Sequence, residues 1–177
     1  MPADPDEFWL LRDTGLVTSN AGASVRLLQA ATPHQWDEAR RLVREYAASL
    51  NVDLSFQNFD EELQHFASEY AAPDGAFILA TQAGQYLACI GLRRFAEDVG
   101  EIKRLYVVPA ARGRGLGRVL VEHIIAAARE IGYRSVLLDT LPFMKEAQGL
   151  YLSLGFKPTI AYRFNPIEGS AFLRLDL

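Results

Sequence analysis

Residues 101–117 read EIKRLYVVPAARGRGLG, an apolar run that meets a proline and then a short loop of glycine and arginine. A strongly apolar segment follows at once, so the pattern predicts a strand, a loop and a helix in succession. The glycines at 113, 115 and 117 let the backbone approach an anion without a side chain in the way. Amides at a helix N-terminus bind phosphate, and a guanidinium binds it through two parallel hydrogen bonds. This stretch is therefore predicted to hold a phosphate-bearing ligand.

Two common nucleotide motifs do not fit this loop. A P-loop needs Gly-Lys followed by Ser or Thr, and a dinucleotide fingerprint needs the spacing G-x-G-x-x-G; the chain has neither here. The pattern present is [RQ]-x-x-G-x-[GA], at Arg112–Gly117, preceded by Leu105–Pro109. It closely resembles the acetyl-CoA loop of the GNAT superfamily of N-acetyltransferases. A glycine-arginine turn without a ligand is the alternative.

A second stretch strengthens this resemblance. Residues 147–156 read AQGLYLSLGF and match the family pattern A-x-x-L-Y-x-x-x-G-F, with Tyr151 placed 34 residues after Gly117. In the family the tyrosine hydroxyl points at the cofactor sulfur, so the resemblance implies that Tyr151 is catalytic; a tyrosine that only packs in the core is the alternative. Met144 stands where the family often has asparagine. That polar contact is either lost or supplied by another residue, such as Asp139 or Thr140.

The periodicity predicts an ordered series of strands and helices over most of the chain. The predicted elements are a strand at 24–30, helices at 33–49 and from Asp60, strands near 76–81, 86–94 and 101–108, a helix at 116–131, a strand at 134–139, a helix at 142–154 and two final strands. This is also the element order of the GNAT fold. The resemblance implies one α/β domain with a mixed, mostly antiparallel sheet of about six to seven strands and about four flanking helices.

In that fold two central strands splay apart to admit the cofactor, and here they correspond to residues 101–108 and 134–139. The acetyltransferase domain is expected to span residues 23–177. Residues 1–22 are interpreted as an N-terminal extension, partly disordered or docked through the apolar run Phe8–Leu11.

The resemblance implies acetyl-CoA as cofactor and CoA as product. Backbone amides near Tyr106 and Val107 are expected to polarise the thioester carbonyl. The residues implied in cofactor binding are Leu105, Tyr106, Val107, Arg112, Gly113, Arg114, Gly115, Leu116, Gly117, Thr140 and Tyr151.

Acetyl transfer to an amine requires a neutral nucleophile. A lysine-like amine with a pKa of about 10.4 needs about 4.6 kcal/mol to become neutral at pH 7, so a base near the acceptor helps. Glu101 is the predicted base, by its similarity in position to the glutamate of histone-type relatives; a solvated glutamate, or a base acting through water, is the alternative. Strand alternation predicts that Glu101, Lys103, Leu105 and Val107 share one face. The pKa of a tyrosine, about 10, exceeds that of a thiol, about 8.5, so Tyr151 is predicted to donate a hydrogen bond to the leaving sulfur.

The family's acceptor groove is lined by the connector between the first two helices and by the loop between the last two strands. These segments mix aromatic rings with polar groups, which suits a small amine that has an apolar part. Arg163 is suited to hold a carboxylate, which favours an amino acid or a similar acceptor. The predicted acceptor-binding residues are Phe56, Gln57, Tyr162, Arg163 and Asn165.

Composition limits the other function classes. The net charge of −4 does not favour nucleic acid or an anionic membrane as partner. A single cysteine and three histidines without shared spacing predict no metal site and no catalytic triad. We expect a cytoplasmic N-acetyltransferase that uses direct attack in a ternary complex, and a homodimer is common in the family. The open alternatives are a non-catalytic acyl-CoA-binding or regulatory module, another acyl group, or an oxygen acceptor.

Overall fold

The computed structural model describes residues 16–18 and 24–177, with the backbone alone described at 16–18 and at Phe56. The expected docking of Phe8–Leu11 lies outside the described residues. Leu16–Thr18, within the predicted extension, pairs antiparallel with the first predicted strand.

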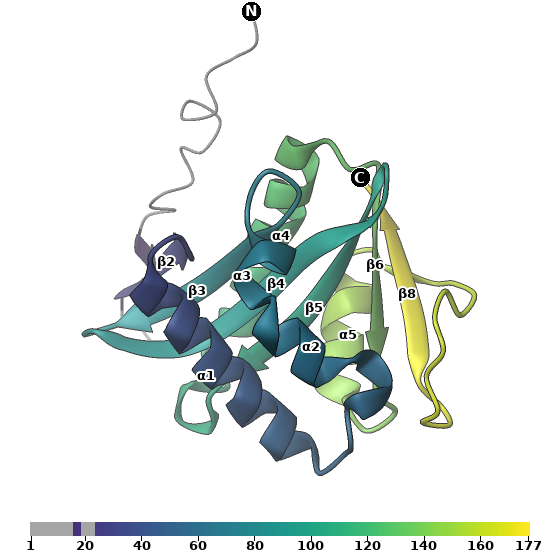
Figure 1. Cartoon of the computed structure of the whole chain (residues 1–177), viewed down its shortest axis with the longest axis horizontal. Helices are drawn as coiled ribbons and strands as arrows, with labels where there is room; N and C mark the ends of the chain where they lie inside the picture. The colour runs from purple at the N-terminus through teal and green to yellow at the C-terminus, as the bar shows by residue number, and fades with distance from the viewer. Residues whose placement is uncertain (1–15, 19–23) are drawn as a thin grey trace, which may run out of the picture.

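A mixed sheet forms the centre of the described chain (Figure 1), in the strand order β1-β2-β3-β4-β5-β6-β8-β7. Neighbouring strands run antiparallel except β5 and β6, which are parallel. Six strands are long and the two edge strands have two or three residues, which agrees with the predicted sheet. The strands are β1 (Leu16–Thr18), β2 (Ser24–Gln29), β3 (Ala76–Gln82), β4 (Gln85–Ala96), β5 (Val99–Val107), β6 (Ser135–Thr140), β7 (Lys157–Pro158) and β8 (Ala171–Asp176).

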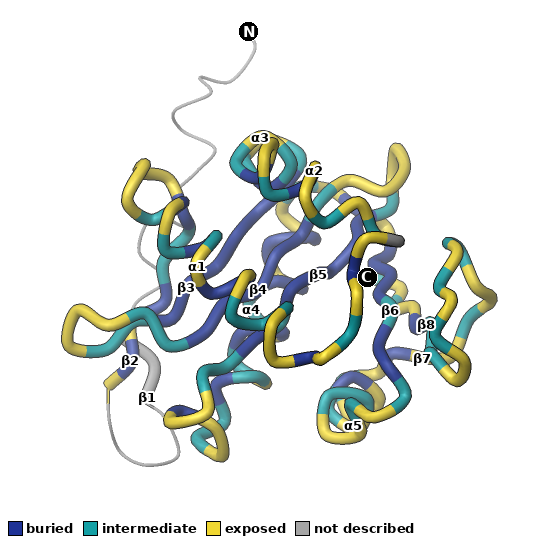
Figure 2. Tube along the Cα trace, turned by 60° about the horizontal axis from the view of Figure 1, so that its bottom comes forward, coloured by how far each residue is buried: buried dark blue, intermediate teal, exposed yellow. Residues whose placement is uncertain are grey.

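Helices cover both faces of this sheet, because alternate residues of the strands are apolar on both sides. Phe77 and Leu79 of β3 pack under α1 and α3, whereas Ile78 and Ala80 pack against α4. Figure 2 shows the central strands buried between helices whose outer surfaces are exposed. The helices are α1 (Pro33–Leu50), α2 (Phe59–Gln64), α3 (Phe66–Tyr70), α4 (Leu116–Ile131) and α5 (Lys145–Ser153), with single 3-10 turns at Ser55–Gln57 and Pro109–Ala111.

Local sequence sets the ends of the two long helices. Thr32 and Gln35 form a capping box at the start of α1, each side chain accepting from the other's backbone amide. Gly115 and Gly132 bound α4 with positive φ values of 80° and 99°, a conformation that glycine adopts without steric cost. The start and the end of α4 are therefore fixed by residues readable in the sequence.

The second helix, predicted as one element from Asp60, is divided into α2 and α3 at His65, where φ is −104°. The ring Nδ1 of His65 lies 3.2 Å from the Glu61 carbonyl oxygen. The helix predicted at 142–154 begins at Lys145 instead, after a turn in which the Met144 amide bonds to the Leu141 carbonyl. Of the two final strands, β7 has only two residues, and the Thr159 amide after it still bonds to the Phe172 carbonyl of β8.

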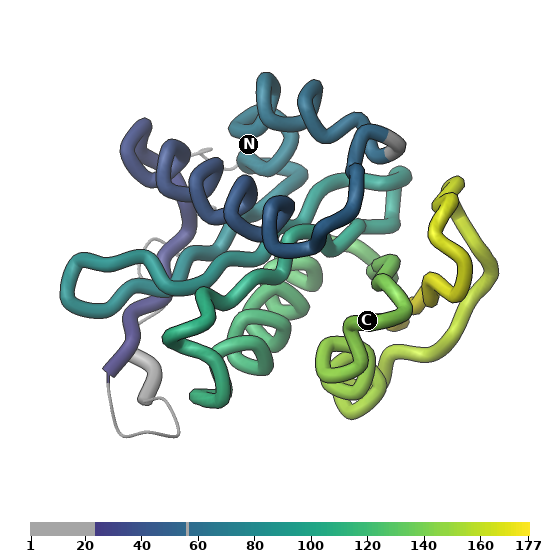
Figure 3. Tube along the Cα trace, turned by 90° about the horizontal axis from the view of Figure 1, so that it is seen from below, coloured from purple at the N-terminus to yellow at the C-terminus, as the bar shows by residue number. Residues whose placement is uncertain are grey.

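Strands β5 and β6 diverge as predicted. They pair only through Val99–Glu101 and Ser135–Leu137, and beyond these residues β5 has no neighbour on that side. Figure 3 shows the part of the chain from β6 through α5 to β8 set apart from the part built on β2–β5. The divergence exposes one edge of β5 to a ligand.

A β-bulge in β5 overturns the predicted alternation. Arg104 has φ of 62°, and the register against β4 shifts between Cys89 and Gly91. A bulge adds one residue to one strand, so residues on either side of it change faces. Leu105 and Val107 consequently pack on the α4 face of the sheet. The prediction that Glu101 and Lys103 share a face with Leu105 and Val107 is therefore wrong.

Candidate active site

The predicted phosphate loop leaves a run of amides without partners. The amides of residues 113–118 form no hydrogen bond among the described residues, and the first bonded one is Val119, which donates to the Gly115 carbonyl. Gly113 has φ of 72°, and a Cβ added there would meet no atom within 4 Å, so the loop has open space above it. Consecutive free amides at the N-terminus of α4 suit a phosphate or pyrophosphate group.

The two loop arginines are already anchored to the protein. Arg112 donates from Nε to the Val107 carbonyl at 3.1 Å, and Arg114 donates to the Gln82 amide oxygen at 2.8 Å. Each anchor leaves further guanidinium donors for an anion, because arginine carries five N–H groups.

A cleft of about 650 Å³, here called the loop cleft, runs from this loop along β5 to the start of α5. The backbone of β5 faces it with free groups. Val108 donates its amide to Leu87 of β4, so alternation turns the Val107 amide the other way, towards the diverging edge. The loop cleft contains the predicted residues Leu105, Tyr106, Val107, Arg112, Gly113, Gly115, Leu116 and Gly117.

A second, smaller cavity of about 60 Å³ lies between the diverging strands and is here called the strand cavity. It shares Tyr46, Leu105 and Met144 with the loop cleft, so the two spaces adjoin. Lys103 and Asp139 face it from β5 and β6. This arrangement joins an apolar passage to charged groups at its inner end.

Tyr151 reaches the strand cavity from α5. Its side chain packs edge-on against Phe156, and its hydroxyl forms no hydrogen bond among the described residues. Burial, followed by the neighbouring Tyr46 and Asp139, raises the pKa of Tyr151 well above its ordinary value. The phenol therefore remains protonated, with a proton available for a ligand.

Tyr46 is a cavity residue that the sequence did not reveal. It lies on α1 and lines both the loop cleft and the strand cavity. Burial raises the pKa of Tyr46 to about 12. Only its position near the end of α1, beside the diverging strands, distinguishes it from a core tyrosine.

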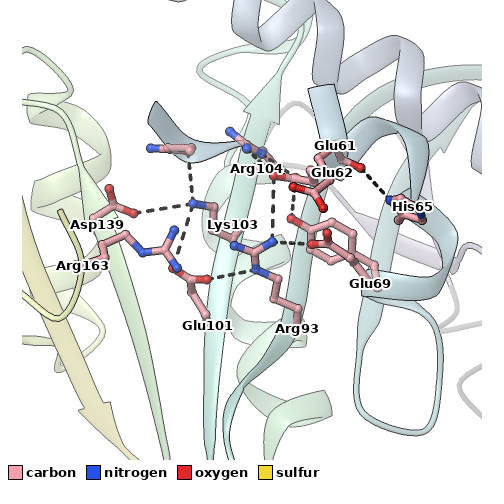
Figure 4. Close-up of polar contacts among 12 residues, drawn as sticks. Glu61, Glu62, His65, Glu69, Arg93, Glu101, Lys103, Arg104, Asp139 and Arg163 are labelled. Atoms are coloured by element: carbon pink, nitrogen blue, oxygen red, sulfur yellow. Dashed lines mark hydrogen bonds and ion pairs between the residues drawn. The ribbon is translucent and has the colours of Figure 1, made fainter. Parts of the chain in front are cut away.

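Charged side chains surround Glu101 on the inner side of the strand cavity (Figure 4). Glu101 is 1% exposed, and its Oε2 accepts from Arg93 at 3.0 Å. Its Oε1 forms an ion pair with Arg163 at 2.5 Å and accepts a hydrogen bond from the Tyr162 hydroxyl at 3.1 Å. Arg93 was not predicted as a site residue, although an arginine within an apolar strand was the available signal.

Lys103 lies next to this group and is 4% exposed at its side chain. Its ammonium donates to the Gln57 side-chain oxygen at 3.1 Å and lies 3.9 Å from Asp139 Oδ1 and 4.0 Å from Glu101 Oε1. Burial lowers the pKa of Lys103 to about 8, because the attraction of Glu101 does not fully offset desolvation.

A neighbouring buried pair serves the scaffold. Arg104 binds Glu62 of α2 through two hydrogen bonds, and the Tyr70 hydroxyl donates to the same carboxylate. Burial by itself would raise the pKa of Glu62, but the hydrogen bond and charge of Arg104 outweigh it and the pKa lies below its usual value. The bulge at Arg104 thus ties β5 to the helices above it.

The predicted acceptor residues converge on the same place. Gln57, Tyr162 and Arg163 bind Lys103 or Glu101, and Asn165 donates to Asp139 Oδ2 at 3.0 Å. The side chain of Phe56 lies outside the described residues. The Thr140 hydroxyl faces the Met144 sulfur at 3.7 Å, and both residues line the strand cavity.

A loop of free amides at a helix N-terminus, a strand edge opened by divergence and a buried tyrosine together suit an enzyme of the acetyltransferase type. The chain matches the acetyltransferase (GNAT) family over residues 36–156. It therefore belongs to this family, and the predicted membership and fold are confirmed.

Known relatives agree with this assignment. The chain is 37% identical over 157 residues to an uncharacterised N-acetyltransferase of Schizosaccharomyces pombe, covering 88% of this chain and 96% of that protein. It is 29% identical over 135 residues to an aminoalkylphosphonate N-acetyltransferase of Salmonella typhimurium, covering 73% and 84%. The GNAT domain of PAT from S. lividans has the same fold, with a TM-score of 0.72, 20% identity and coverage of 98% and 99%. These matches confirm the predicted class, a GNAT-family N-acetyltransferase.

The GNAT family generally uses acetyl-CoA, and the residues present fit this group. The free amides of residues 113–118 suit its pyrophosphate, and the open edge of β5 suits an extended amide-bearing arm. Gly117 and Leu150 both line the loop cleft, and a Cβ added at Gly117 would lie 3.5 Å from Leu150, an ordinary van der Waals contact. Among the described residues no helix is long and apolar enough to cross a bilayer.

Proposed function

We propose that this protein transfers an acetyl group from acetyl-CoA to the primary amine of a small or amino-acid-like molecule, by direct attack while both ligands are bound. One observation carries the proposal: the free Val107 amide, the unpartnered Tyr151 hydroxyl and a charged acceptor side all meet where β5 and β6 diverge. When bound, acetyl-CoA supplies an activated acetyl carbonyl and a thiolate leaving group.

The residues of the loop, of β5 and of the strand cavity have different roles in this proposal. The amides of residues 113–118, with Arg112 and Arg114, hold the pyrophosphate. The Val107 amide donates to the acetyl oxygen, where a fixed donor stabilises developing negative charge. The Tyr151 phenol keeps its proton and donates a hydrogen bond to the sulfur, because its raised pKa disfavours full proton transfer.

An anionic group on the acceptor is part of the proposal. Arg163 Nε is buried and has no hydrogen-bond partner among the described residues, although buried donors are normally bonded. Arg163 also borders a depression of about 460 Å³ that it shares with Glu101, Arg93 and Phe95. The Salmonella relative is named for an aminoalkylphosphonate, an amine that carries an anion. A carboxylate or phosphonate on the acceptor would satisfy the free donor of Arg163.

The test begins with calorimetric binding of acetyl-CoA and CoA, followed by CoA release from acetyl-CoA against a panel of amines with and without a carboxylate. Binding with amine-dependent CoA release supports the enzyme. Binding without turnover on any amine supports the acyl-CoA-binding module instead, and hydroxyl compounds in the panel test the oxygen acceptor. Absence of binding would refute the assignment of the loop cleft.

Arg163→Ala tests the acceptor class, with Arg134→Ala as a matched control because Arg134 is 84% exposed at its side chain. We expect Arg163→Ala to raise KM about tenfold or more for carboxylate-bearing amines and to change KM little for their uncharged analogues. Equal effects on both kinds of amine would remove Arg163 from acceptor recognition.

A further inference from the structure

Two carboxylates flank the diverging strands, Glu101 on β5 and Asp139 on β6, and they differ in how far their oxygens are already used. Both oxygens of Glu101 accept hydrogen bonds, one from Arg93 and the other from Tyr162, and the second oxygen also forms an ion pair with Arg163. A carboxylate so occupied has little room to accept a further proton donor. Glu101 also lines the outer depression and not the strand cavity.

Asp139 has one oxygen free. Oδ2 accepts from Asn165 at 3.0 Å. Among the described residues, Oδ1 forms no hydrogen bond, and the Lys103 ammonium lies 3.9 Å from it, beyond hydrogen-bond distance. The side chain is 5% exposed and lines the strand cavity together with Tyr151. A cavity of about 60 Å³ has room for only a few water-sized groups, so an amine that enters it comes close to Oδ1.

We infer that Asp139 binds the acceptor's amine in the strand cavity and takes its proton during acetyl transfer. The inference rests on the proposed function. The amine nitrogen forms a bond to the acetyl carbon, the carbon–sulfur bond breaks, and its electron pair leaves with the sulfur as thiolate. The proton that the nitrogen loses goes to Asp139 Oδ1, which balances the step without any other reactant.

The surroundings of Asp139 support this task. Lys103 of β5 faces Oδ1 with a positive charge, and Asn165 fixes the other oxygen from the loop before β8. Tyr46 of α1 and Tyr151 of α5 approach from the helices; their pKa values are raised, mainly by burial, so both face the carboxylate as neutral phenols. The pKa of the Tyr162 phenol is also raised, by burial first and then by the negative charges of Glu101 and Asp139.

The geometry also separates the two ends of an acceptor. Its anionic group reaches Arg163 beside Glu101, and its amine reaches Asp139 on the opposite strand, with Lys103 between the two carboxylates. Arg163 and Asp139 therefore recognise different groups of one molecule. An amine that carries a carboxylate or phosphonate a few bonds away is the acceptor class that satisfies both residues.

The test compares kcat/KM against pH for the wild type, Asp139→Asn and Glu101→Gln, using the best amine from the panel. Asparagine at 139 retains an oxygen for Asn165 but removes the base. We expect Asp139→Asn to lose about 10²-fold or more near neutral pH, with acetyl-CoA affinity unchanged and the deficit shrinking as pH rises, because hydroxide and the free amine replace the base. For the Glu101→Gln variant, kcat/KM should depend on pH in the same way as for the wild type.

Asn165→Ala provides the structural comparison, since it removes the hydrogen bond between Asn165 and Asp139, which Asp139→Asn retains, and it keeps the Asp139 carboxylate. A pure positioning role for Asp139 predicts that Asn165→Ala reproduces the whole effect of Asp139→Asn, including its pH dependence. That outcome, or an Asp139→Asn variant within threefold of wild type at every pH, overturns the inference while the proposed function stands. If Glu101→Gln, and not Asp139→Asn, shows the loss of kcat/KM near neutral pH that shrinks as pH rises, the base is Glu101.

A second measurement does not depend on the folding of the asparagine variant. Added formate should restore part of the activity of Asp139→Ala, because it places a small carboxylate in the vacated space, and should not restore Glu101→Ala. Rescue of Glu101→Ala alone overturns the inference. A wild type that binds acetyl-CoA but releases CoA with no amine refutes the proposed function, and the inference falls with it.

Discussion

Replacing Lys103 by methionine tests the energetic cost of the buried cation beside the strand cavity. The lysine side chain is 4% exposed, and burial holds its pKa at about 8 instead of the ordinary 10.5. Glu101 and Asp139 raise this pKa again, but not enough to cancel desolvation. Methionine has a similar length and no charge, so the change removes the ammonium with little change in packing.

The magnitude follows from the two pKa values. A difference of about 2.5 between the unfolded and the folded protein corresponds to about 3 kcal/mol, at 1.36 kcal/mol for each pKa unit. Below pH 8 the lysine is charged in both states, so the folded state carries the full cost. Between pH 8 and 10.5 the unfolded chain binds more protons than the folded one, and the stability of the wild type rises with pH.

We therefore expect Lys103→Met to unfold with a free energy about 3 kcal/mol higher than wild type at about pH 7, the difference falling towards zero at about pH 10.5. Urea unfolding followed by circular dichroism measures this, and Lys145→Met on the exposed start of α5 is the control. A methionine variant that is less stable at pH 7, or a difference independent of pH, would refute the reasoning. It would mean that the attraction of Glu101 and Asp139 for the Lys103 ammonium exceeds the cost of removing that ammonium from water.

Three further predictions concern the buried pair Glu62–Arg104, the loop before α4, and Tyr151. Glu62→Gln should lower the free energy of unfolding by about 3 kcal/mol at neutral pH, because it leaves Arg104 buried without its charge partner. This loss should shrink in acid. The Glu62 carboxylate stabilises the fold fully above its ordinary pKa, and this contribution disappears as the pH falls through its lowered pKa in the folded state. An equal loss at all pH values would contradict this. Gly115→Ala should weaken acetyl-CoA binding and cost about 1 kcal/mol in stability, because φ is 80° there. As a control, Gly149→Ala in the exposed middle of α5 should leave stability unchanged or raise it. Calorimetry measures the binding of each variant, and thermal unfolding measures its stability. Tyr151→Phe should lower kcat much more than it weakens CoA binding, and an unchanged kcat would remove Tyr151 from the mechanism.

Much of the fold and the cofactor side of the site follows from local sequence. The spacing of Arg112, Gly113, Gly115 and Gly117 determines the loop, because each glycine acts on the backbone where it stands. The strand before it, the apolar helix after it and Tyr151 a fixed distance further along were therefore predictable. The capping box at Thr32 and the helix end at Gly132 are local in the same sense.

Only the tertiary structure decided which side chains face one another at the acceptor side. The bulge at Arg104 changes the faces of β5, and its register shift depends on the pairing with β4, which no periodicity within β5 reports. Glu101 obtains one partner from β4, Arg93, eight residues earlier in the chain, and another from the loop before β8, Tyr162, 61 residues later. Asp139 faces the cavity because β6 diverges from β5 at that point. Sequence spacing determines the backbone conformation of residues that are neighbours in the chain. Which carboxylate oxygens are hydrogen-bonded depends instead on donors from other elements, and only folding brings these donors within reach.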